Sequence, residues 1–301
     1  MRILMEKEQK GLYNPDHEHD ACGIGFIANI KGSKSYQHID DALTILEHLE
    51  HRGACGCEDN TGDGAGISFQ LPHGFFVSEC IPLGIKLPEA GYYGVGMLFF
   101  PKGMVSECKE ILAEAANQLG LEIMGYRKVP VNRTDVGDTA LSVEPEIEQV
   151  FIKRPETLTD VLAFERKLFV LRNYASHTIN NTIRKNEVGF YIASLSASTI
   201  VYKGQLTSNQ VRYYFPDLQN RKLTSAYALV HSRFATNTFP SWALAQPFRY
   251  IAHNGEINTL QGNLNWLSTN EKNFASPFFT RGNRYDITIG AGQAVRFSQF
   301  R

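Results

Sequence analysis

The chain has 301 residues, of which 43% are hydrophobic and 20% charged, and its net charge is -1. This composition is typical of a soluble globular protein. It offers no basic surface for nucleic acid or an anionic membrane, so neither is expected as a partner. No stretch approaches the roughly 18 apolar residues of a membrane-spanning helix. Five cysteines without a repeating spacing argue against a disulfide framework and fit a reducing compartment.

The chain opens on a polar leader, residues 1–21, that lacks the apolar segment of a secretory signal. We therefore expect a cytoplasmic protein. The leader ends at Ala21, and a glycine-punctuated apolar run from Cys22 to Ala28 then predicts a strand. A small residue before a cysteine at a strand start is the pattern expected where a propeptide is removed and the cysteine becomes the first residue.

The remaining elements follow from hydrophobic periodicity and turn residues. Apolar side chains at helical spacing predict helices at 39–49, 105–119 and 158–183. Strands are predicted at 67–71, 92–100, 147–153, 188–195, 199–202, 226–234 and 249–253, with 188–195 and 199–202 paired to each other. Because strands arrive in runs with helices between the runs, the pattern favours an α+β layered fold of antiparallel sheets covered by helices.

Cys22 is the first candidate for chemistry. After removal of the leader, its thiol and a free α-amino group belong to one residue, with unperturbed pKa values of roughly 8.5 and about 7.7–8.0. These values suit proton transfer from nucleophile to base near neutral pH. In the chain as written, the nitrogen of Cys22 is acylated by Ala21, so this base is blocked until the leader leaves. The alternative is a buried, inert cysteine.

A second candidate is the pair Asn254-Gly255, which follows a predicted strand. The amide of an asparagine side chain and the backbone N–H of the next glycine can converge on one oxyanion. Loss of such a donor typically costs about 2.7–4 kcal/mol of transition-state stabilisation. Asn-Gly is also a common two-residue hairpin turn, so the residues alone leave both interpretations open.

Two arginines are candidates for holding a substrate carboxylate, because guanidinium presents a bidentate fork. Arg233 ends the run Tyr227–Val230, which is expected to be buried, so it needs an anion, a carbonyl or water. Arg52 ends a predicted helix, where stabilising the helix dipole or anchoring a loop is an equal alternative.

Metal and nucleotide motifs are weak in this sequence. Cys55 and Cys57 have CxC spacing without a second pair, and His48 and His51 lack the HExxH arrangement, so no metal is predicted. The glycine-rich loop around Gly64 follows no predicted strand, which argues against a dinucleotide fingerprint.

Four segments closely resemble the amino-terminal glutaminase domain of glutamate synthase large chains, a branch of the class II glutamine amidotransferases among the N-terminal nucleophile hydrolases. They are Cys22–Phe26, His51–Gly53, Thr61–Gly66 and the block His231–Trp266. The last is the most discriminating, with the runs HSRFATNTFPSW, AQPFRY and AHNGEINT.

The resemblance implies a four-layer α-β-β-α sandwich and hydrolysis of the glutamine side-chain amide to glutamate and ammonia through a thioester. By similarity, Cys22 is the nucleophile and its freed amine the base. Asn254 and Gly255 form the oxyanion hole, Arg233 holds the glutamine carboxylate, and Arg52 supports that pocket. In the family, ammonia passes to a synthase module that uses 2-oxoglutarate, FMN and an iron–sulfur cluster. No cofactor is expected within these 301 residues.

One segment departs from the family pattern. Where the family has Gly-Gln followed by Ser-Asp-Ser, whose acid binds the ammonium group of the substrate, this chain has Gly292-Gln293 followed by Ala294. The acid is missing, and Arg296 adds a positive charge nearby.

The predicted organisation is therefore a leader at 1–21, an amidotransferase domain at 22–290 and a non-matching end at 291–301. We hypothesise that the end reflects a truncated or frame-shifted gene product. Resequencing past the Gln293 codon tests this, and an uninterrupted frame ending at Arg301 contradicts it.

Two alternatives to a glutamate synthase glutaminase domain are weighed. One is another class II amidotransferase, of the amidophosphoribosyl or hexosamine type, although these lack the Thr-Phe-Pro-Ser-Trp block. The other is a catalytically impaired remnant that folds and binds glutamine without turnover.

Overall fold

The computed structural model describes residues 22–53, 55, 58–183, 189–234, 239–249, 251–253, 261–270 and 273. The predicted leader, the pair Asn254-Gly255 and the predicted non-matching end lie outside the described residues.

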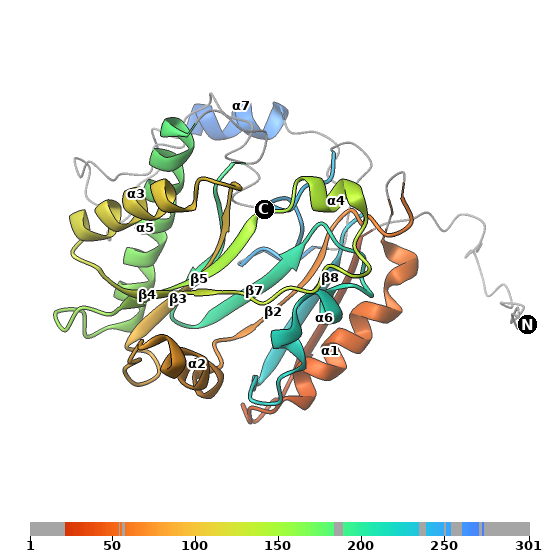
Figure 1. Cartoon of the computed structure of the whole chain (residues 1–301), viewed down its shortest axis with the longest axis horizontal. Coiled ribbons are helices and arrows are strands. Elements are labelled where there is room, and N and C mark those ends of the chain that lie inside the picture. The colour runs from red at the N-terminus through yellow and green to blue at the C-terminus, as the bar shows by residue number, and fades with distance from the viewer. Residues whose placement is uncertain are drawn as a thin grey trace, which may run out of the picture.

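Two antiparallel four-stranded sheets form the centre of the molecule (Figure 1). The first has the order β1-β8-β2-β7, with bounds Gly23–Ala28, Tyr227–Ser232, Ala65–Gln70 and Thr199–Gly204. The second has the order β4-β5-β3-β6, with bounds Glu122–Lys128, Glu146–Lys153, Tyr93–Phe100 and Tyr191–Ser196. The predicted α+β class is confirmed.

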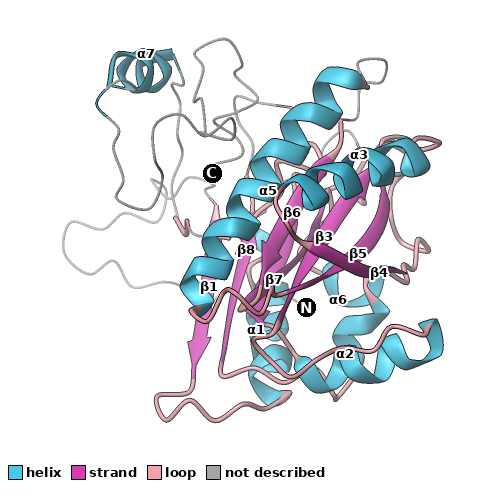
Figure 2. Cartoon of the chain, turned by 90° about the vertical axis from the view of Figure 1, so that its left-hand side faces the viewer, coloured by secondary structure: helices cyan, strands magenta, loops and turns pink. Residues whose placement is uncertain are grey.

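Helices cover the outer face of each sheet. The helices of the described residues are α1 (Gln37–His48), η2 (Glu50–Arg52), α2 (His73–Cys80), η3 (Ile81–Leu83), α3 (Val105–Gln118), α4 (Asp138–Ser142), α5 (Val161–Thr182), α6 (Val211–Tyr214), η4 (Pro216–Gln219) and α7 (Gln261–Asn270). Helix α1 packs on β1 and β8 of the first sheet, whereas α3 and α5 lie side by side over the second sheet (Figure 2). This arrangement gives the predicted α-β-β-α layers. Among the described helices, none combines the length and apolar character needed to cross a bilayer.

Alternating side chains of β3 show how the layers are built, since successive residues of a strand point to opposite faces of the sheet. Val95, Met97 and Phe99 belong to the core between the two sheets. Leu98 and Phe100 belong to a separate core beneath α3 and α5. A strand buried on both faces therefore carries a continuous apolar run.

A buried polar network also joins the sheets. Arg127 of β4 donates from Nη1 and Nη2 to the two carboxylate oxygens of Asp217, at 2.7 and 2.8 Å. The hydroxyl of Tyr202, on β7 of the other sheet, donates to the same carboxylate at 3.0 Å. Burial, reinforced by the charge of Asp217, raises the pKa of Tyr202. Its phenol therefore stays protonated and remains a donor.

Two predicted strand features are wrong. Strands β6 and β7 do not pair with each other, because β6 pairs with β3 and β7 with β2, in different sheets. The corner between them is held from α5, where Glu165 Oε1 accepts from Ser196 Oγ at 2.7 Å and from the Ala197 N–H at 2.8 Å. The first residue of the predicted strand, Val188, lies outside the described residues.

The predicted strand at 249–253 is also absent from the described part of that segment. Side chains hold this segment instead of a strand ladder. Arg249 Nη1 donates to the Leu195 carbonyl at 2.9 Å, and His231 contacts the His253 carbonyl at 3.1 Å.

Packing of α1 on β1 leads to a stability prediction. A Cβ added at Gly25 would clash with Ile45 Cγ2 and would lie 2.9 Å from Val230 Cγ2. Gly25→Ala should therefore lower the free energy of unfolding by about 1–3 kcal/mol, measured by urea titration. Gly74→Ala is the control, since its Cβ meets nothing within 4 Å and a helical alanine is favoured by up to about 1 kcal/mol. Equal midpoints for the two variants contradict the packing argument.

Candidate active site

Strand pairing brings Cys22 to the end of β8. Gly23 lies opposite Ser232 in the antiparallel β1–β8 register, so Cys22 and Arg233 follow at the same end of the sheet. The Cys22 side chain is buried, with 5% of its surface exposed. Its Sγ lies 3.4 Å from the Phe234 backbone nitrogen, which donates to it, and 3.7 Å from the Phe234 carbonyl. These two contacts with the Phe234 backbone fix the position of the sulfur.

Arg233 is anchored through the turn-rich loop that precedes β2. Its backbone N–H donates to the Gly64 carbonyl at 2.8 Å, and its Nη1 donates to the Asp63 carbonyl at 3.1 Å. Gly64 adopts φ +130°, which side chains rarely permit, so the loop depends on glycine here. The result is a buried Arg233 held by two backbone carbonyls, one bonded to its backbone N–H and one to its guanidinium.

Arg52 reaches the same region from η2. A Cβ added at Gly23 would lie 2.9 Å from Arg52 Cβ, so the stem of Arg52 packs against the residue that follows Cys22. A Cβ added at Gly53 would lie 2.6 Å from Ser232 Oγ, so this segment also packs closely on the end of β8. Three of the predicted site residues thus converge from three separate segments.

The predicted oxyanion pair lies outside the described residues, but His253, which immediately precedes it, is described. His231 Nε2 lies 3.1 Å from the His253 carbonyl. A carbonyl only accepts, so this contact requires the Nε2–H tautomer of His231. The Gln246 side-chain amide donates from Nε2 to His253 Nε2 at 2.9 Å. Both the backbone and the ring of His253 are thereby held.

Burial lowers the pKa of His231 to about 4. The hydrogen bond to the His253 carbonyl opposes this shift, whereas the charges of His253 and Arg233 add to it. His231 is therefore a neutral, structural donor at physiological pH.

Several residues around this site were not singled out from the sequence: Asp63, His231, Phe234 and Gln246. The signal for Asp63 was its turn-rich loop Thr61–Gly66, which resembles the family pattern. No periodicity marks His231 or Gln246, because their roles depend on contacts with His253 across the fold.

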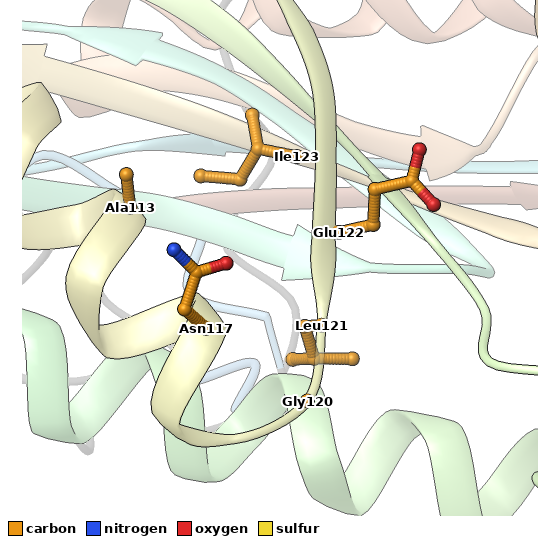
Figure 3. Close-up of a pocket in the computed structure, with 6 residues that line it drawn as sticks. All are labelled: Ala113, Asn117, Gly120, Leu121, Glu122 and Ile123. Carbon is orange, nitrogen blue, oxygen red and sulfur yellow. The ribbon is translucent and has the colours of Figure 1, made fainter.

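Within the described residues, no group of three histidine, cysteine, aspartate or glutamate side chains is placed to hold a metal ion. A pocket does lie on the second sheet, between the end of α3 and the start of β4 (Figure 3). It is lined by Ala113, Asn117, Gly120, Leu121, Glu122 and Ile123. None of these is a predicted site residue, and Cys22 belongs to the other sheet.

Comparison with known proteins agrees with this fold. The family model "Glutamine amidotransferases class-II" matches residues 22–288, and the chain belongs to this family. It is 48% identical over 278 residues to the glutamate synthase [NADPH] large chain of Bacillus subtilis, a match that covers 91% of this chain and 18% of that protein.

Two further relatives are also glutamate synthases. The chain is 46% identical over 277 residues to the glutamate synthase [NADH] of Saccharomyces cerevisiae, covering 88% of this chain and 12% of that protein. It is 40% identical over 274 residues to the chloroplastic ferredoxin-dependent enzyme of Spinacia oleracea, covering 90% and 16%. The chain therefore spans less than a fifth of the length of each relative, and the resemblance inferred from its motifs is confirmed.

The depressed pKa of His231 predicts acid sensitivity. In the unfolded chain His231 takes up a proton near pH 6.5, whereas in the folded protein it does so only near pH 4. The free energy of unfolding should therefore fall between these values, by up to about 3 kcal/mol. His231→Gln, measured by urea titration from pH 7 to pH 4, should flatten this decline. His48→Gln, on the exposed surface of α1, is the control and should keep it. If the free energy of unfolding of His231→Gln falls with pH as steeply as that of the wild type, His231 is not the group responsible for the decline.

Proposed function

We propose that this class II glutamine amidotransferase domain hydrolyses the side-chain amide of glutamine, with Cys22 as the nucleophile. The observation that carries the proposal is the register of β1 and β8, which brings Cys22 and Arg233, both buried, to the same end of the sheet. One group attacks a carbonyl carbon and the other binds a carboxylate, as glutamine requires.

In the proposed reaction, removal of the leader first frees the α-amino group of Cys22. That amine accepts the thiol proton, and the thiolate attacks the amide carbon of glutamine. The Asn254 side-chain amide and the Gly255 N–H stabilise the oxyanion. The protonated amine then donates to the leaving nitrogen, so ammonia departs and a thioester remains. Water adds to the thioester and releases glutamate, which restores the thiol.

The described contacts support these roles. The Phe234 N–H directed at Cys22 Sγ holds the sulfur in place before attack. The Asp63 carbonyl accepts from Arg233 Nη1 and so orients the guanidinium that we assign to the substrate carboxylate. The Arg52 stem supports the wall of the pocket beside Gly23.

By similarity to the relatives, we propose that the ammonia serves glutamate biosynthesis in a longer glutamate synthase, through a synthase module that holds FMN and an iron–sulfur cluster. The domain itself is proposed to need no cofactor. The glutamine side-chain amide supplies both the electrophile and the leaving group, so no redox step occurs here.

The sequence around Gly292 favours a second candidate, a domain that binds glutamine without turnover. Ala294 follows Gly292-Gln293 where the family places the segment with its ammonium-binding acid. An unpaired buried charge typically costs about 2–5 kcal/mol. Glutamine binding is then expected to be weak, and saturation at ordinary substrate concentrations contradicts this expectation of weak binding.

The nucleophile is tested by N-terminal mass and ammonia release from glutamine. The wild-type chain should begin at Cys22 and release ammonia, and Cys22→Ser should abolish release. The loss should reach about three orders of magnitude or more, since the nucleophile itself is removed. Cys108→Ser, in the core beneath α3, is the control and should retain activity. Persistent activity in Cys22→Ser removes Cys22 from the mechanism. An intact Met1 start without release supports the second candidate.

The carboxylate grip is tested by Arg233→Lys. Lysine keeps the charge but loses the bidentate fork, so KM for glutamine should rise about ten- to a hundredfold. Steady-state kinetics measure the change. Arg133→Lys is the control, because that guanidinium bonds Glu144 instead of lying in the site. An unchanged KM in Arg233→Lys excludes this role.

A further inference from the structure

Lys203, near the end of β7, is a fully buried cation with 0% of its surface exposed. Its Nζ donates to the Tyr191 hydroxyl at 3.1 Å and to the carbonyls of Ala243 and Ala245 at 3.1 and 2.7 Å. The rings of Phe248 and Tyr191 lie 4.2 and 4.8 Å from Nζ. The acceptors of these three hydrogen bonds are all neutral.

Burying a lysine ammonium group costs free energy, because the charged form loses its hydration. Burial, together with the positive charges of Arg172 and Arg233, holds the pKa of Lys203 well below its ordinary value. A methionine of similar length would fill the same space without this cost. The hydrogen bonds of Lys203 therefore suggest a role other than net stability.

Those bonds fix one short loop, residues 243–246, against the start of β2. A Cβ added at Gly64 would lie 2.8 Å from Ala245 Cβ, and one added at Gly66 would lie 2.8 Å from the Gln246 carbonyl. Lys203 itself is the register partner of Gly66. The loop therefore packs directly on the backbone that leads into β2, and Lys203 holds it there from β7.

The same loop contacts both halves of the proposed site. On one side it packs on Gly64, whose carbonyl accepts the backbone N–H of Arg233. On the other side, Gln246 holds the ring of His253, the residue before Asn254. A shift of this loop would therefore move the carboxylate grip and the segment that enters the oxyanion pair together.

We propose that Lys203 is a positioning residue for glutamine hydrolysis: through the carbonyls of Ala243 and Ala245, it sets the loop that aligns Arg233 with the segment entering Asn254. This inference rests on the proposed function. Lys203 touches neither the substrate nor the reacting atoms, and it acts through the loop.

The test compares Lys203→Met with Tyr202→Phe in the full chain. Tyr202 is the neighbouring residue on β7 and is equally buried, but its hydroxyl bonds Asp217 and Gln149 between the sheets. Tyr202→Phe therefore controls for lost buried hydrogen bonds on the same strand. Both variants are first shown to be folded at the assay temperature by circular dichroism.

Two labels of Cys22 separate positioning from folding. Iodoacetamide needs only an accessible thiolate, whereas 6-diazo-5-oxo-norleucine must be bound as a glutamine analogue before it alkylates. In Lys203→Met, the rate at which iodoacetamide labels Cys22 should stay unchanged. The rate of labelling by the glutamine analogue should fall about ten- to a hundredfold, since misplacement of reacting groups by about 1 Å can cost that much. Its kcat/KM for ammonia release should fall by the same factor. Tyr202→Phe should change neither label.

Each result decides the question. A Lys203→Met variant that matches Tyr202→Phe in both labels and in kcat/KM overturns the inference and leaves the proposed function intact. Equal losses with both labels assign Lys203 to the nucleophile or the fold, and also overturn it. A wild-type chain that starts at Cys22 but releases no ammonia overturns the proposed function itself. If Lys203→Met does not fold, Gln246→Met replaces it. This variant removes the hydrogen bond between the loop and His253, so the same selective loss of labelling by the analogue is expected.

Discussion

The antiparallel register of β1 and β8 is the constraint on which the proposed site depends. It aligns Gly23 with Ser232, so Cys22 and Arg233 meet at the same end of the first sheet. A slip of one residue would turn every side chain of β1 to the opposite face. Close packing of α1 at Gly25 opposes such a slip, because no larger residue fits there. The helix layer thus fixes the position of the proposed nucleophile.

Around this register, polar groups are buried in places where an ordinary core would be apolar. Arg127 joins the two sheets, His231 holds the segment at His253, and Lys203 holds the loop at Ala245. Arg127 is paired with Asp217, Lys203 donates three hydrogen bonds, and the neutral His231 donates from Nε2. Two of the three, His231 and Lys203, reach backbone carbonyls of segments beside the proposed site. Buried polarity in this fold is therefore concentrated where loops must be held in one position.

Within the described residues, the fold has two separate hydrophobic cores. The core between the sheets is continuous with α1, the core beneath α3 and α5 is separate, and neither contains Cys22 or Arg233. The site itself is assembled from strand ends and loops, which gives it backbone carbonyls and N–H groups as fixed partners. A scaffold of strands thus positions Cys22 and Arg233, while loops supply their immediate contacts.

The sequence by itself determined the class of fold, most strands and helices, and the residues with reactive side chains, because hydrophobic periodicity and local motifs are properties of short segments. The predictions that β6 pairs with β7 and that 249–253 forms a strand were wrong, because strand pairing and side-chain contacts depend on residues outside the segment itself. No sign in the sequence pointed to Lys203, and Gln246 was marked only as a member of the AQPFRY run. Only the tertiary structure decided that Lys203, His231 and Gln246 hold the loops around Cys22 and Arg233, since these contacts form only when folding brings the side chains to the carbonyls and ring that they bind.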